Sequence, residues 1–598
     1  MGGLYVADFE TTTKKEDCRV WAYGIVNLED ESDIIIGRTI DGYMNWCRQQ
    51  TDRPKIYFHN LKFDCQFILP WLLRHGFKYV EEEKDLESNT FTAVITDKNV
   101  YYSLTIMFYR NGKNVKKVTF RDSLKLIPLS VKQIAKSYHM DIGKLEIDYT
   151  AHDDKPENAP LTSEEEEYLI NDILIVKRGI ESFRKNGLVG NTISACALNE
   201  FKKLINRRYF DRFFPEPKYD GQVRQSYRGG FTYLNPKFKG KIVKNGVVLD
   251  VNSLYPSVMY DRLLPYGEPI AYEGEYETDE LYPLYIQQIR CSFKIKPGKI
   301  PTIQIKNSNF YQGNEYLTSS NGDEVVLTLT SVDLKLFLDH YKAYNLEYIS
   351  GYKFRGARGI FKDYIDKWAN AKINAKKEGN HGLYLISKLM QNSLYGKFGT
   401  ALKERRKKPY LDENGVVKMI DLDEKRKDGV YVPMASFITA YAREVTIRSA
   451  QKVQDAYLSG KSNIEFVYAD TDSLHLSSPD FKLPEGLDID EYKLGAWDHE
   501  ATFDKAKFIR QKCYMERHII DEESYKKGKQ GDHPYLYIIK DGKYYYTKIT
   551  VSGMPEDCYK HVTFSNFKVG ATYRGKKQQI KVKGGVVLED GTFTIKDI

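Results

Sequence analysis

Short apolar runs alternate with helical patterns over the first 190 residues of the chain. The runs have the length and the β-branched and aromatic content of buried strands. They are Leu4 to Phe9, Ile56 to Phe58, Tyr101 to Phe108 and Lys117 to Phe120. A long helix follows, and Ser163 with Glu166 predicts a capping box at its start. The pattern therefore predicts an α/β domain that is closed by a helix.

Beyond residue 190 the pattern predicts hairpins, a mixed region and helices. Asn245-Gly246, between Lys241–Lys244 and Val247–Val251, predicts a β-hairpin that begins a second sheet. Residues 262–359 are mixed and rich in Pro and Tyr, and residues 360–398 are helical in pattern. Asp412 to Gly415 predicts another hairpin within 400–429, with basic residues on both sides of it. A solvated ribbon and a nucleic-acid contact explain these charges equally well.

Length and composition indicate several folded domains. The 598 residues exceed the roughly 250 to 300 at which one core stops growing. Hydrophobic residues make up 41% and charged residues 29%, which excludes a disordered polymer. The net charge of +8 permits a polyanionic partner without demonstrating one. The 46 Tyr and 29 Phe fill cores or stack on bases.

The cysteines and the N-terminus exclude several other classes. Seven cysteines show no C-x-x-C spacing, so neither a zinc site nor a disulfide framework is predicted. The first eight residues lack the basic and apolar regions of a signal peptide, and no apolar run approaches a membrane span. We expect a soluble protein of a reducing compartment, with no membrane contact.

The first acidic cluster lies in the N-terminal part of the chain. Asp8 and Glu10 share one face of a predicted strand, where their carboxylates can share a divalent ion. Asp64 follows an apolar strand, and Tyr168 and Asp172 lie one helical turn apart. Four carboxylates and a phenol suit phosphodiester hydrolysis, although exposed carboxylates on a strand are also common without any function.

The second cluster lies at the ends of two apolar runs. Val247 to Asp250 is one, and Ile464 to Asp472 is the other. If the strands lie side by side, Asp250 and Asp472 meet, and divalent cations must neutralise them. This arrangement indicates phosphoryl transfer, and a pair of polar turns is the simpler alternative.

A predicted helix from Tyr384 to Tyr395 lies between these two runs. Lys388 and Asn392 share a stripe with both tyrosines, and Leu385 and Leu389 are expected to face a core. Lys388 on this stripe suits a contact with a triphosphate. A solvated lysine is the alternative.

The motifs together resemble the protein-primed family B DNA polymerases of the bacteriophage phi-29 type. Eight motifs match in order along nearly the whole chain. They are Asp8-Phe9-Glu10, Asn60-Leu61-Lys62-Phe63-Asp64, Tyr168 with Asp172, Tyr227-Arg228-Gly229-Gly230, Asp250-Val251-Asn252-Ser253-Leu254-Tyr255-Pro256, Asn392-Ser393-Leu394-Tyr395-Gly396, Tyr468-Ala469-Asp470-Thr471-Asp472-Ser473 and Lys512-Cys513-Tyr514.

The resemblance implies an α+β multidomain fold. An RNase H-like α/β 3′–5′ exonuclease domain precedes a right-hand polymerase with palm, fingers and thumb, and two insertions of the terminal-protein region interrupt the polymerase. The implied boundaries are 1–190 for the exonuclease, 191–261 and 430–551 for the palm, 262–359 for the first insertion, 360–399 for the fingers, 400–429 for the second insertion and 552–598 for the thumb.

The resemblance also implies roles for the polymerase residues. Asp250 and Asp472 are the expected metal ligands, with Asp470 beside them and the backbone of Val251 assisting. Tyr255 is similar to a steric gate against ribose, and Tyr384 stands where the family often has a second lysine. The remaining expected contacts with nucleotide, primer and template are Lys388, Asn392, Tyr395, Lys512, Tyr514, Thr439 and Arg443.

For the exonuclease, the resemblance implies that Asp8, Glu10, Asp64 and Asp172 bind metal, with Tyr168 and Lys144 assisting. Tyr227 resembles the residue that links the two activities. The expected single-strand contacts are Thr11, His59, Asn60, Phe63, Ser123 and Leu124.

The implied function is DNA-dependent DNA synthesis from a protein primer, processive and with strand displacement and proofreading. The implied cofactor is Mg²⁺, which Mn²⁺ can replace. The implied partners are deoxynucleoside triphosphates, primer-template and single-stranded DNA, and a terminal protein. We expect a monomer in the cytoplasm of a bacterial host. The alternatives are an exonuclease whose polymerase half only binds DNA, and an RNA-templated polymerase, for which Tyr468-Ala469-Asp470-Thr471-Asp472 has the wrong spacing.

Overall fold

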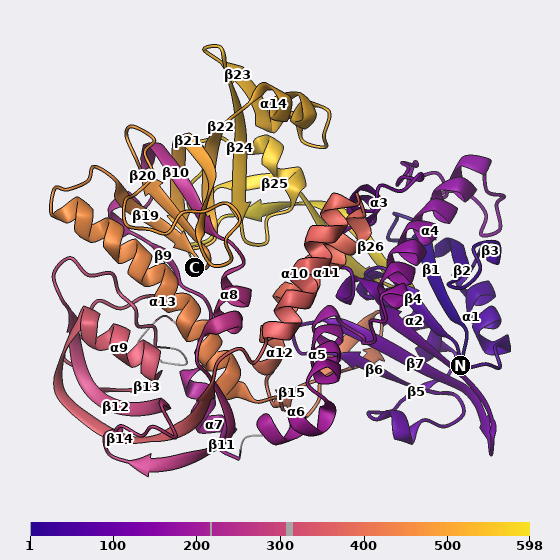
Figure 1. Ribbon diagram of the computed structural model, residues 1–598. Helices are drawn as coiled ribbons and strands as arrows, with labels where there is room; N and C mark the ends of the chain where they lie inside the picture. Colours follow the sequence, from indigo (N-terminus) through magenta and orange to yellow (C-terminus); the bar gives the residue numbers. More distant parts are fainter. Residues whose placement is uncertain (1, 216–217, 306–311, 313–314, 428, 598) are drawn as a thin grey trace.

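The computed structural model describes residues 2–215, 218–305, 312, 315–427 and 429–597 (Figure 1). Two eight-stranded sheets, a four-stranded sheet and three two-stranded ribbons form within these residues, together with helices that cover them. None of the described helices is both long enough and apolar enough to cross a bilayer. The protein is a multidomain α+β structure, and the predicted domain boundaries stay a prediction.

The first sheet has helices on both faces. Its strand order is β3-β2-β1-β4-β8-β7-β6-β5, and β4 is parallel to both of its neighbours. Helix α4 (Ser163–Lys185) packs on β1 and β2, and helices α1 (Ile40–Gln49) and α2 (Leu61–Arg74) pack on the other face. The strands are β1 Leu4–Thr11, β2 Val20–Asn27, β3 Ile34–Gly37, β4 Lys55–Phe58, β5 Lys78–Tyr79, β6 Thr90–Ile95, β7 Tyr101–Asn111 and β8 Asn114–Asp122.

The start of α4 differs from the prediction by one residue. Thr162, not Ser163, is the N-cap, and it forms a capping box with Glu165, not Glu166. Both oxygens of Glu165 have partners, because one accepts from the backbone of Thr162 and the other lies 3.0 Å from Nε2 of buried His152. The local pattern allows Glu165 or Glu166 as the capping-box partner, and the tertiary contact with His152 favours Glu165.

The second sheet is antiparallel throughout. Its order is β23-β24-β22-β21-β10-β20-β19-β9, and helix α13 (Val432–Leu458) packs on β19 and β20. The strands are β9 Thr232–Leu234, β10 Ile242–Val251, β19 Glu465–Asp470, β20 Ser473–Ser477, β21 Trp497–Arg510, β22 Cys513–Ile520, β23 Tyr537–Lys540 and β24 Lys543–Val551.

The predicted hairpin at Asn245-Gly246 is wrong. β10 runs through both residues as one strand, paired with β20 on one side and β21 on the other. A Cβ on Gly246 would lie 2.1 Å from the ring of Phe503 and 2.3 Å from the carbonyl oxygen of Leu476. The glycine is therefore needed for close packing inside the sheet.

A separate four-stranded sheet fills most of residues 262–359. Its order is β11-β14-β12-β13, and helix α9 (Ser331–His340) packs on it. Residues 306–311 and 313–314 of this predicted insertion lie outside the described residues. The strands are β11 Leu264–Glu273, β12 Leu284–Ile295, β13 Val325–Thr330 and β14 Tyr341–Ala357.

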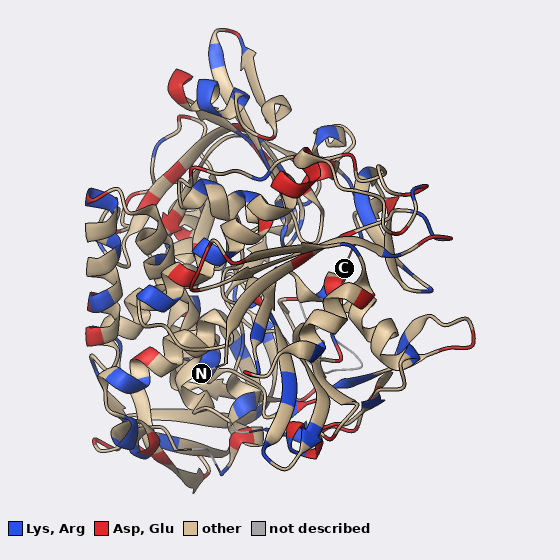
Figure 2. Cartoon of the chain, turned by 90° about the vertical axis from the view of Figure 1, so that its right-hand side faces the viewer, with Lys and Arg blue, Asp and Glu red and all other residues tan. Residues whose placement is uncertain are grey.

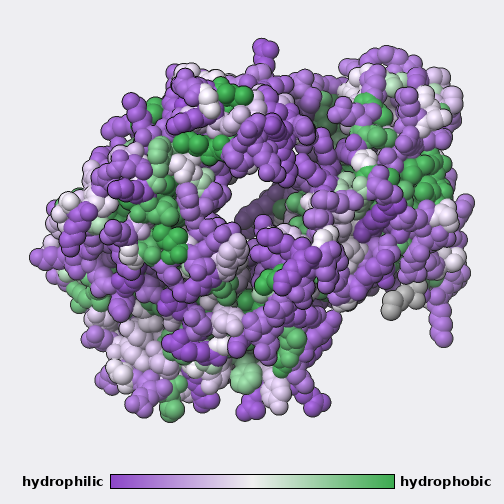
Figure 3. Space-filling view, turned by 45° about the horizontal axis from the view of Figure 1, so that its top comes forward, coloured by the Kyte–Doolittle hydropathy of each residue, from purple (hydrophilic) through white to green (hydrophobic). Residues whose placement is uncertain are grey.

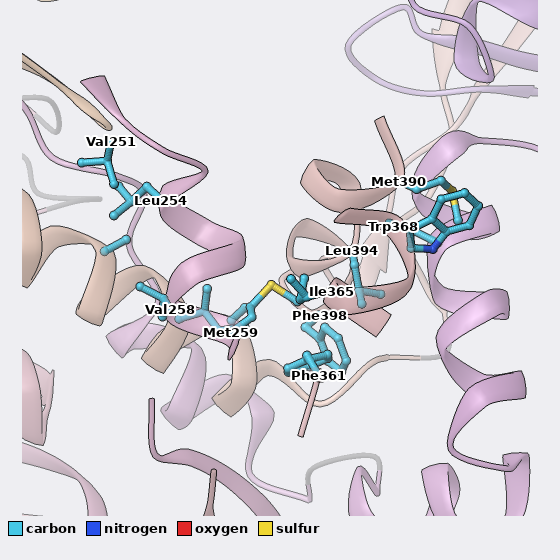
Figure 4. Close-up of a cluster of buried hydrophobic side chains, with 14 of the residues drawn as sticks. Val251, Leu254, Val258, Met259, Phe361, Ile365, Trp368, Met390, Leu394 and Phe398 are labelled. Carbon is cyan, nitrogen blue, oxygen red and sulfur yellow. The ribbon is translucent and has the colours of Figure 1, made fainter. Parts of the chain in front are cut away.

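The predicted helical region at 360–398 is confirmed as α10 (Lys362–Lys377), α11 (His381–Ser393) and the short α12 (Tyr395–Phe398). Figure 4 shows the side chain of Met259, in α8 (Leu254–Asp261), pointing toward Ile365 of α10. The face of α11 that enters the core is Ile386 and Met390. The expectation for Leu385 and Leu389 is only partly met, because both are half-buried.

Several smaller elements complete the chain. The predicted turn at Asp412 to Gly415 is confirmed and joins β16 (Lys407–Leu411) to β17 (Val417–Asp421). The 3-10 turns are η1 Glu83–Asp85, η2 Ser123–Lys125, η3 Arg224–Ser226, η4 Pro236–Phe238, η5 Pro534–Leu536 and η6 Glu556–His561. The other elements are α3 Val131–Ser137, α5 Ile193–Leu204, α6 Arg207–Phe213, α7 Asp220–Val223, α14 Glu522–Lys529, β15 Lys403–Glu404, β18 Lys425–Arg426, β25 Thr572–Val582 and β26 Gly585–Thr594.

The C-terminal hairpin β25–β26 bridges two cores. Tyr573 and Phe593 pack with residues of β22 and β24, whereas Val586 is buried in the core of the first sheet. Nζ of Lys581 donates to the carbonyl oxygen of Val417, so the bridge also contacts the β16–β17 hairpin. Figure 3 shows an opening through the molecule whose rim is mostly hydrophilic.

The surface charges are interspersed. Figure 2 shows basic and acidic segments next to one another over the side of the molecule that it presents. With a net charge of only +8, an anionic partner must be recognised at local clusters of cations.

Candidate active sites

The first site lies between β1 and α4. Asp8 and Glu10 point toward α4, because they share the face of β1 that carries Val6, whose side chain belongs to the core beneath that helix. Carboxylate oxygens of Asp8, Glu10 and Asp172 all lie within 4.8 Å of one another. The structure therefore brings together the strand pair and the helical carboxylate that the sequence predicts.

Asp64 is also part of this site. It lies in the first turn of α2 and is 2% exposed, and its charge interacts with those of Asp8 and Glu10. Oδ1 of Asp64 and Oδ1 of Asp172 are buried and have no hydrogen-bond partner among the described residues. Clustered carboxylates with unpartnered oxygens are the ligand set that Mg²⁺ or Mn²⁺ takes, so the residues fit a divalent cation.

The carboxylates of this site hold protons more tightly than usual. Burial, together with the charge of Asp172, raises the pKa of Asp8 to about 7. Burial and the neighbouring carboxylates raise the pKa values of Glu10 and Asp64 as well. The ionised carboxylates of this site therefore repel one another strongly, and a bound cation would relieve the repulsion.

Lys144 and Tyr168 complete the site. Nζ of Lys144 pairs with Oδ2 of Asp172 and donates to the hydroxyl of Tyr168 at 2.9 Å. The Tyr168 hydroxyl therefore has a fixed position beside Asp172 and can orient a water molecule there.

The predicted single-strand contacts lie at the adjoining edge of the sheet. Asn60 precedes α2 in a left-handed conformation with φ 76°, and its backbone N–H donates to Oδ1 of Asp122 at 3.1 Å. His59 lies 2.9 Å from Oγ of Ser123 and 2.7 Å from the carbonyl oxygen of Leu129. Burial lowers the pKa of His59, which favours the neutral imidazole. Thr11, Phe63 and Leu124 are half-buried nearby in sequence, and their contact with DNA stays a prediction.

The second site lies where β10 meets the β19–β20 hairpin. Asp250 pairs in register with Ser473, and the backbone N–H of Val251 donates to the carbonyl oxygen of Asp472 at 2.8 Å. The hairpin turn is fixed by Thr471, which has φ 67° and whose carbonyl oxygen accepts from Oγ1 of Thr446. The two aspartates therefore adjoin as predicted, but the two apolar runs do not lie side by side, because β20 lies between β10 and β19.

Asp250 and Asp472 also repel one another. Burial and the charge of Asp472 raise the pKa of Asp250 to about 7, and burial raises the pKa of Asp472. Two further acids, Asp498 and Glu500, act on this pair, and Asp498 lies opposite Asp250 in β21. The sequence analysis missed them, although their period-two spacing in Trp497 to Glu500 is the signal that identified Asp8 and Glu10.

The Lys512 motif borders the same site. Nζ of Lys512 pairs with Oδ1 of Asp470, and its backbone N–H donates to the hydroxyl of Tyr468 at 2.9 Å. Tyr514 is 4% exposed and packs on Tyr468 with 5.2 Å between ring centroids. Asp470 is thus neutralised by a lysine, and the contact of Lys512 and Tyr514 with primer stays a prediction.

Two stacked tyrosines lie next to the second site. The rings of Tyr255 and Tyr395 are 3.9 Å apart and nearly parallel. Gly230 allows this approach, because a Cβ there would lie 3.0 Å from the Tyr255 hydroxyl and 2.5 Å from Cγ2 of Thr471. Similarly, a Cβ on Gly399 would lie 2.4 Å from the hydroxyl of Tyr227. Lys388 and Asn392 are exposed on α11.

Thr439 and Arg443 face protein partners. Oγ1 of Thr439 donates to the carbonyl oxygen of Ala435, within α13. The guanidinium of Arg443 pairs with Asp333 of α9 at 2.6 Å and donates to the carbonyl oxygen of Gly229 at 2.7 Å. Arg443 therefore ties the first insertion to the Tyr227-to-Gly230 motif, and its contact with template or primer stays a prediction.

A buried polar network lies behind the second site. Glu516 is fully buried, and its two oxygens lie 2.7 Å from Nδ1 of His475 and 3.0 Å from Nε2 of His518. Although burial opposes it, the two imidazoles hold the pKa of Glu516 well below its usual range. Nε2 of His475 lies 3.3 Å from Oγ of Ser473, the residue that pairs with both Asp250 and Asp470. Glu516 therefore fixes the orientation of a ring that supports the strands carrying Asp250 and Asp470.

We expect Glu516→Gln to slow the DNA synthesis that the family resemblance implies for the second site by about ten- to a hundredfold, and to leave the hydrolysis of single-stranded DNA implied for the first site unchanged. The neutral amide cannot accept from both imidazoles, so His475 loses its fixed orientation. Steady-state incorporation kinetics and single-strand degradation measure the two activities, with exposed Glu485→Gln as the matched control. Equal loss of both activities would indicate general destabilisation and contradict this role.

We expect Mg²⁺ to raise the melting temperature more at about pH 8 than at about pH 6. Because the pKa values of Asp8 and Asp250 are raised to about 7, the folded metal-free protein holds protons that the unfolded chain releases near pH 4. Stability of the metal-free protein therefore falls as the pH rises through 7. Cation binding needs the ionised carboxylates, so it restores stability where they are ionised. Scanning calorimetry measures the shift, and equal shifts at both pH values would contradict the prediction.

The chain is similar to known DNA polymerases in sequence and in structure. The family model described as DNA polymerase type B, organellar and viral, matches residues 47–160 and 150–484. The DNA polymerase of Bacillus phage phi29 is 45% identical over 602 residues, covering 99% of both chains. The structure of phi29 DNA polymerase with primer-template DNA and incoming nucleotides matches with a TM-score of 0.90 at 43% identity, covering 100% of both chains. Its complex with single-stranded DNA matches with a TM-score of 0.88 at 42% identity and the same coverage.

Such coverage and identity show the family. DNA polymerases of this family normally use divalent metals, and the carboxylate cluster of Asp8, Glu10 and Asp172 is of a kind that could hold one. The chain belongs to the type B DNA polymerases of the organellar and viral family, and it is a DNA-directed DNA polymerase of the phi29 kind.

Proposed function

We propose that this polymerase starts DNA synthesis on a terminal protein, extends the strand processively with strand displacement, and proofreads it with a 3′–5′ exonuclease. The observation that carries the proposal is the presence of two separate carboxylate sites, one between β1 and α4 and one between β10 and the β19–β20 hairpin. Each has carboxyl groups with raised pKa values. Two sites of this kind support two phosphoryl-transfer reactions in one chain.

In the polymerase site, Asp250 and Asp472 would hold Mg²⁺, which Mn²⁺ can replace. Bound divalent ions neutralise the charge that develops during phosphoryl transfer. The chain itself orients the reactants. Exposed Lys388 and Asn392 would contact the triphosphate, and the ring of Tyr255, stacked on Tyr395, would exclude a ribose hydroxyl. The paired Lys512 would hold the primer end.

In the exonuclease site, Asp8, Glu10, Asp64 and Asp172 would hold the cations. Tyr168, fixed by Lys144, would orient the attacking water. The two sites lie on different sheets, so a strand end must leave one before it reaches the other. This separation suits proofreading, because a mispaired end frays more easily than a paired one.

The bridge formed by β25 and β26 is the observation that favours processive synthesis with strand displacement. It contacts both α2 and the β16–β17 hairpin, and an opening passes through the molecule (Figure 3). DNA inside a closed ring dissociates slowly, and a narrow ring admits one strand while it excludes the other. The partners would be primer-template DNA, deoxynucleoside triphosphates and a terminal protein. The polymerase would act as a monomer in the cytoplasm of a bacterial host of the phage that encodes it.

A primed single-stranded circle with Mg²⁺ and the four deoxynucleotides tests the proposal. We expect products many times longer than the circle, which require synthesis, processivity and strand displacement together. Omitting the nucleotides should give degradation of the primer from its 3′ end. Synthesis that stops after one circuit would contradict strand displacement, and degradation alone would favour an exonuclease whose polymerase half only binds DNA.

A further inference from the structure

A cleft of about 560 Å³ lies between the first domain and the segment 520–546 that follows the Lys512 motif. Helix α3 forms one wall, with Lys132 and Lys136. The opposite wall and the floor come from Lys527, Leu536, Tyr537 and Tyr546. Lys132 forms an ion pair with Asp532 at 2.7 Å, and this contact joins the two walls. The cleft is outside both carboxylate sites.

The floor of the cleft is apolar and aromatic. Leu536 is buried, and the rings of Tyr537 and Tyr546 are stacked with 4.8 Å between their centroids. Gly528 of α14 makes room for this stack, since a Cβ there would lie 2.1 Å from the Tyr537 ring. Because Gly528 has no side chain, the ring of Tyr537 can pack against α14.

The rim of the cleft carries unneutralised positive charge. The three lysines of the lining outnumber its two acids: Asp532 pairs with Lys132, and Glu556 lies 3.1 Å from Nε2 of His533, which neutralises it only when the imidazole is protonated. Within the described part of the chain, no ion pair involves Lys136 or Lys527, and both are exposed. Aromatic rings beneath free lysines are the combination that binds single-stranded nucleic acid, by base stacking and phosphate attraction.

The cleft is connected to both reaction sites by short stretches of chain. Helix α3 begins two residues after Leu129, whose carbonyl oxygen lies 2.7 Å from Nε2 of His59 at the edge of the exonuclease site. On the other wall, strand β22 starts next to Lys512 and ends at Ile520, which lines the cleft. A strand of eight residues spans about 26 Å. Each wall of the cleft is therefore continuous, along the chain, with a segment that borders one of the two sites.

We propose that this cleft binds single-stranded DNA, and that it holds the part of a strand that continues beyond the exonuclease site. The inference rests on the proposed exonuclease for the identity of the strand. The rings of Tyr537 and Tyr546 offer a stacking surface, and the ammonium groups of Lys136 and Lys527 neutralise phosphates. Such binding is independent of base sequence and sensitive to salt.

The test compares oligodeoxynucleotides of two lengths by fluorescence anisotropy without divalent cations, so that no hydrolysis occurs. We expect Lys136→Gln with Lys527→Gln to weaken binding of an oligonucleotide of about 12 residues by about tenfold. Binding of one of about 4 residues, which fills only the exonuclease site, should not change. For the longer oligonucleotide, the plot of log K against log salt concentration should become less steep by about 1.4, because two phosphate contacts are lost.

The matched control is Lys526→Gln with Lys540→Gln, two exposed lysines of the same segment that do not line the cleft. Equal weakening by the control pair would show a general effect of charge and overturn the proposal. If the cleft variant binds the longer oligonucleotide as tightly as the wild-type protein does, the proposal is also overturned. The cleft would then be left as a binding site for a protein. Exonuclease assays with Mg²⁺ are separate, so failure of the wild-type protein to degrade DNA would contradict the proposed function and not the cleft.

Discussion

Asp472→Ala is expected to lower nucleotide incorporation by about a thousandfold or more while degradation of single-stranded DNA continues at the wild-type rate. Asp472 lies against Asp250 at the end of β10, and the pair is the expected cation site of the polymerase. One carboxylate alone cannot neutralise the same ionic charge or fix its position. The exonuclease carboxylates lie on another sheet, so the substitution leaves them in place.

The measurement is single-turnover incorporation beside a single-strand degradation assay on the same preparation. Asp480→Asn, an exposed carboxylate beyond the end of β20, is the matched control. The charge of Asp472 contributes to the raised pKa of Asp250, so its removal relieves repulsion. The metal-free variant should therefore melt no lower than the wild-type protein. Joint loss of both activities in a folded variant would refute the two-site interpretation.

Asp8→Ala should have the opposite outcome. We expect degradation of single-stranded DNA to fall by about a thousandfold or more, with incorporation on a primed template unchanged. Asp8 is one of three carboxylates, with Glu10 of the same strand and Asp172 of α4, whose oxygens all lie within 4.8 Å of one another. Removing Asp8 takes away its repulsion of Glu10 and leaves only two of the three clustered carboxylates to hold a cation.

Degradation of a labelled single strand measures this effect, and the error frequency of long products gives a second readout. If the exonuclease proofreads, the variant should accumulate more mismatches at an unchanged rate of synthesis. Exposed Asp85→Ala, in the same domain, is the control. Normal degradation by the Asp8 variant would show that the β1 carboxylates take no part in the hydrolysis of single-stranded DNA.

Local spacing predicted the carboxylates well because their geometry is local. Asp8 and Glu10 share a face in any strand, and Tyr168 and Asp172 share a face in any helix. The adjoining of Asp250 and Asp472 needed two strands to pair, and the family resemblance supplied that step. In the structure β10 pairs with β20 and not with β19, and the contact of Val251 with Asp472 shows that the two aspartates adjoin.

The errors came from residues whose role depends on distant partners. Asn245-Gly246 has the sequence of a turn, but Gly246 is required where Phe503 and Leu476 approach the backbone. His475, Glu516 and His518 come from two strands, and no spacing in the sequence shows that they share one buried charge. The buried ion pair of Arg443 with Asp333 likewise joins two helices whose residues lie 110 positions apart in the sequence.

The bridge between the C-terminal hairpin and α2 has a consequence for biosynthesis. Phe67 packs against Gly585, and Val417 and Val586 belong to the same core as Phe67. About 520 residues separate positions 67 and 586, so at 5 to 20 residues per second a ribosome needs roughly half a minute to two minutes between them. During that interval the apolar surface of α2 around Phe67 is uncovered in the nascent N-terminal domain. We therefore expect a chaperone to bind the nascent chain at this helix.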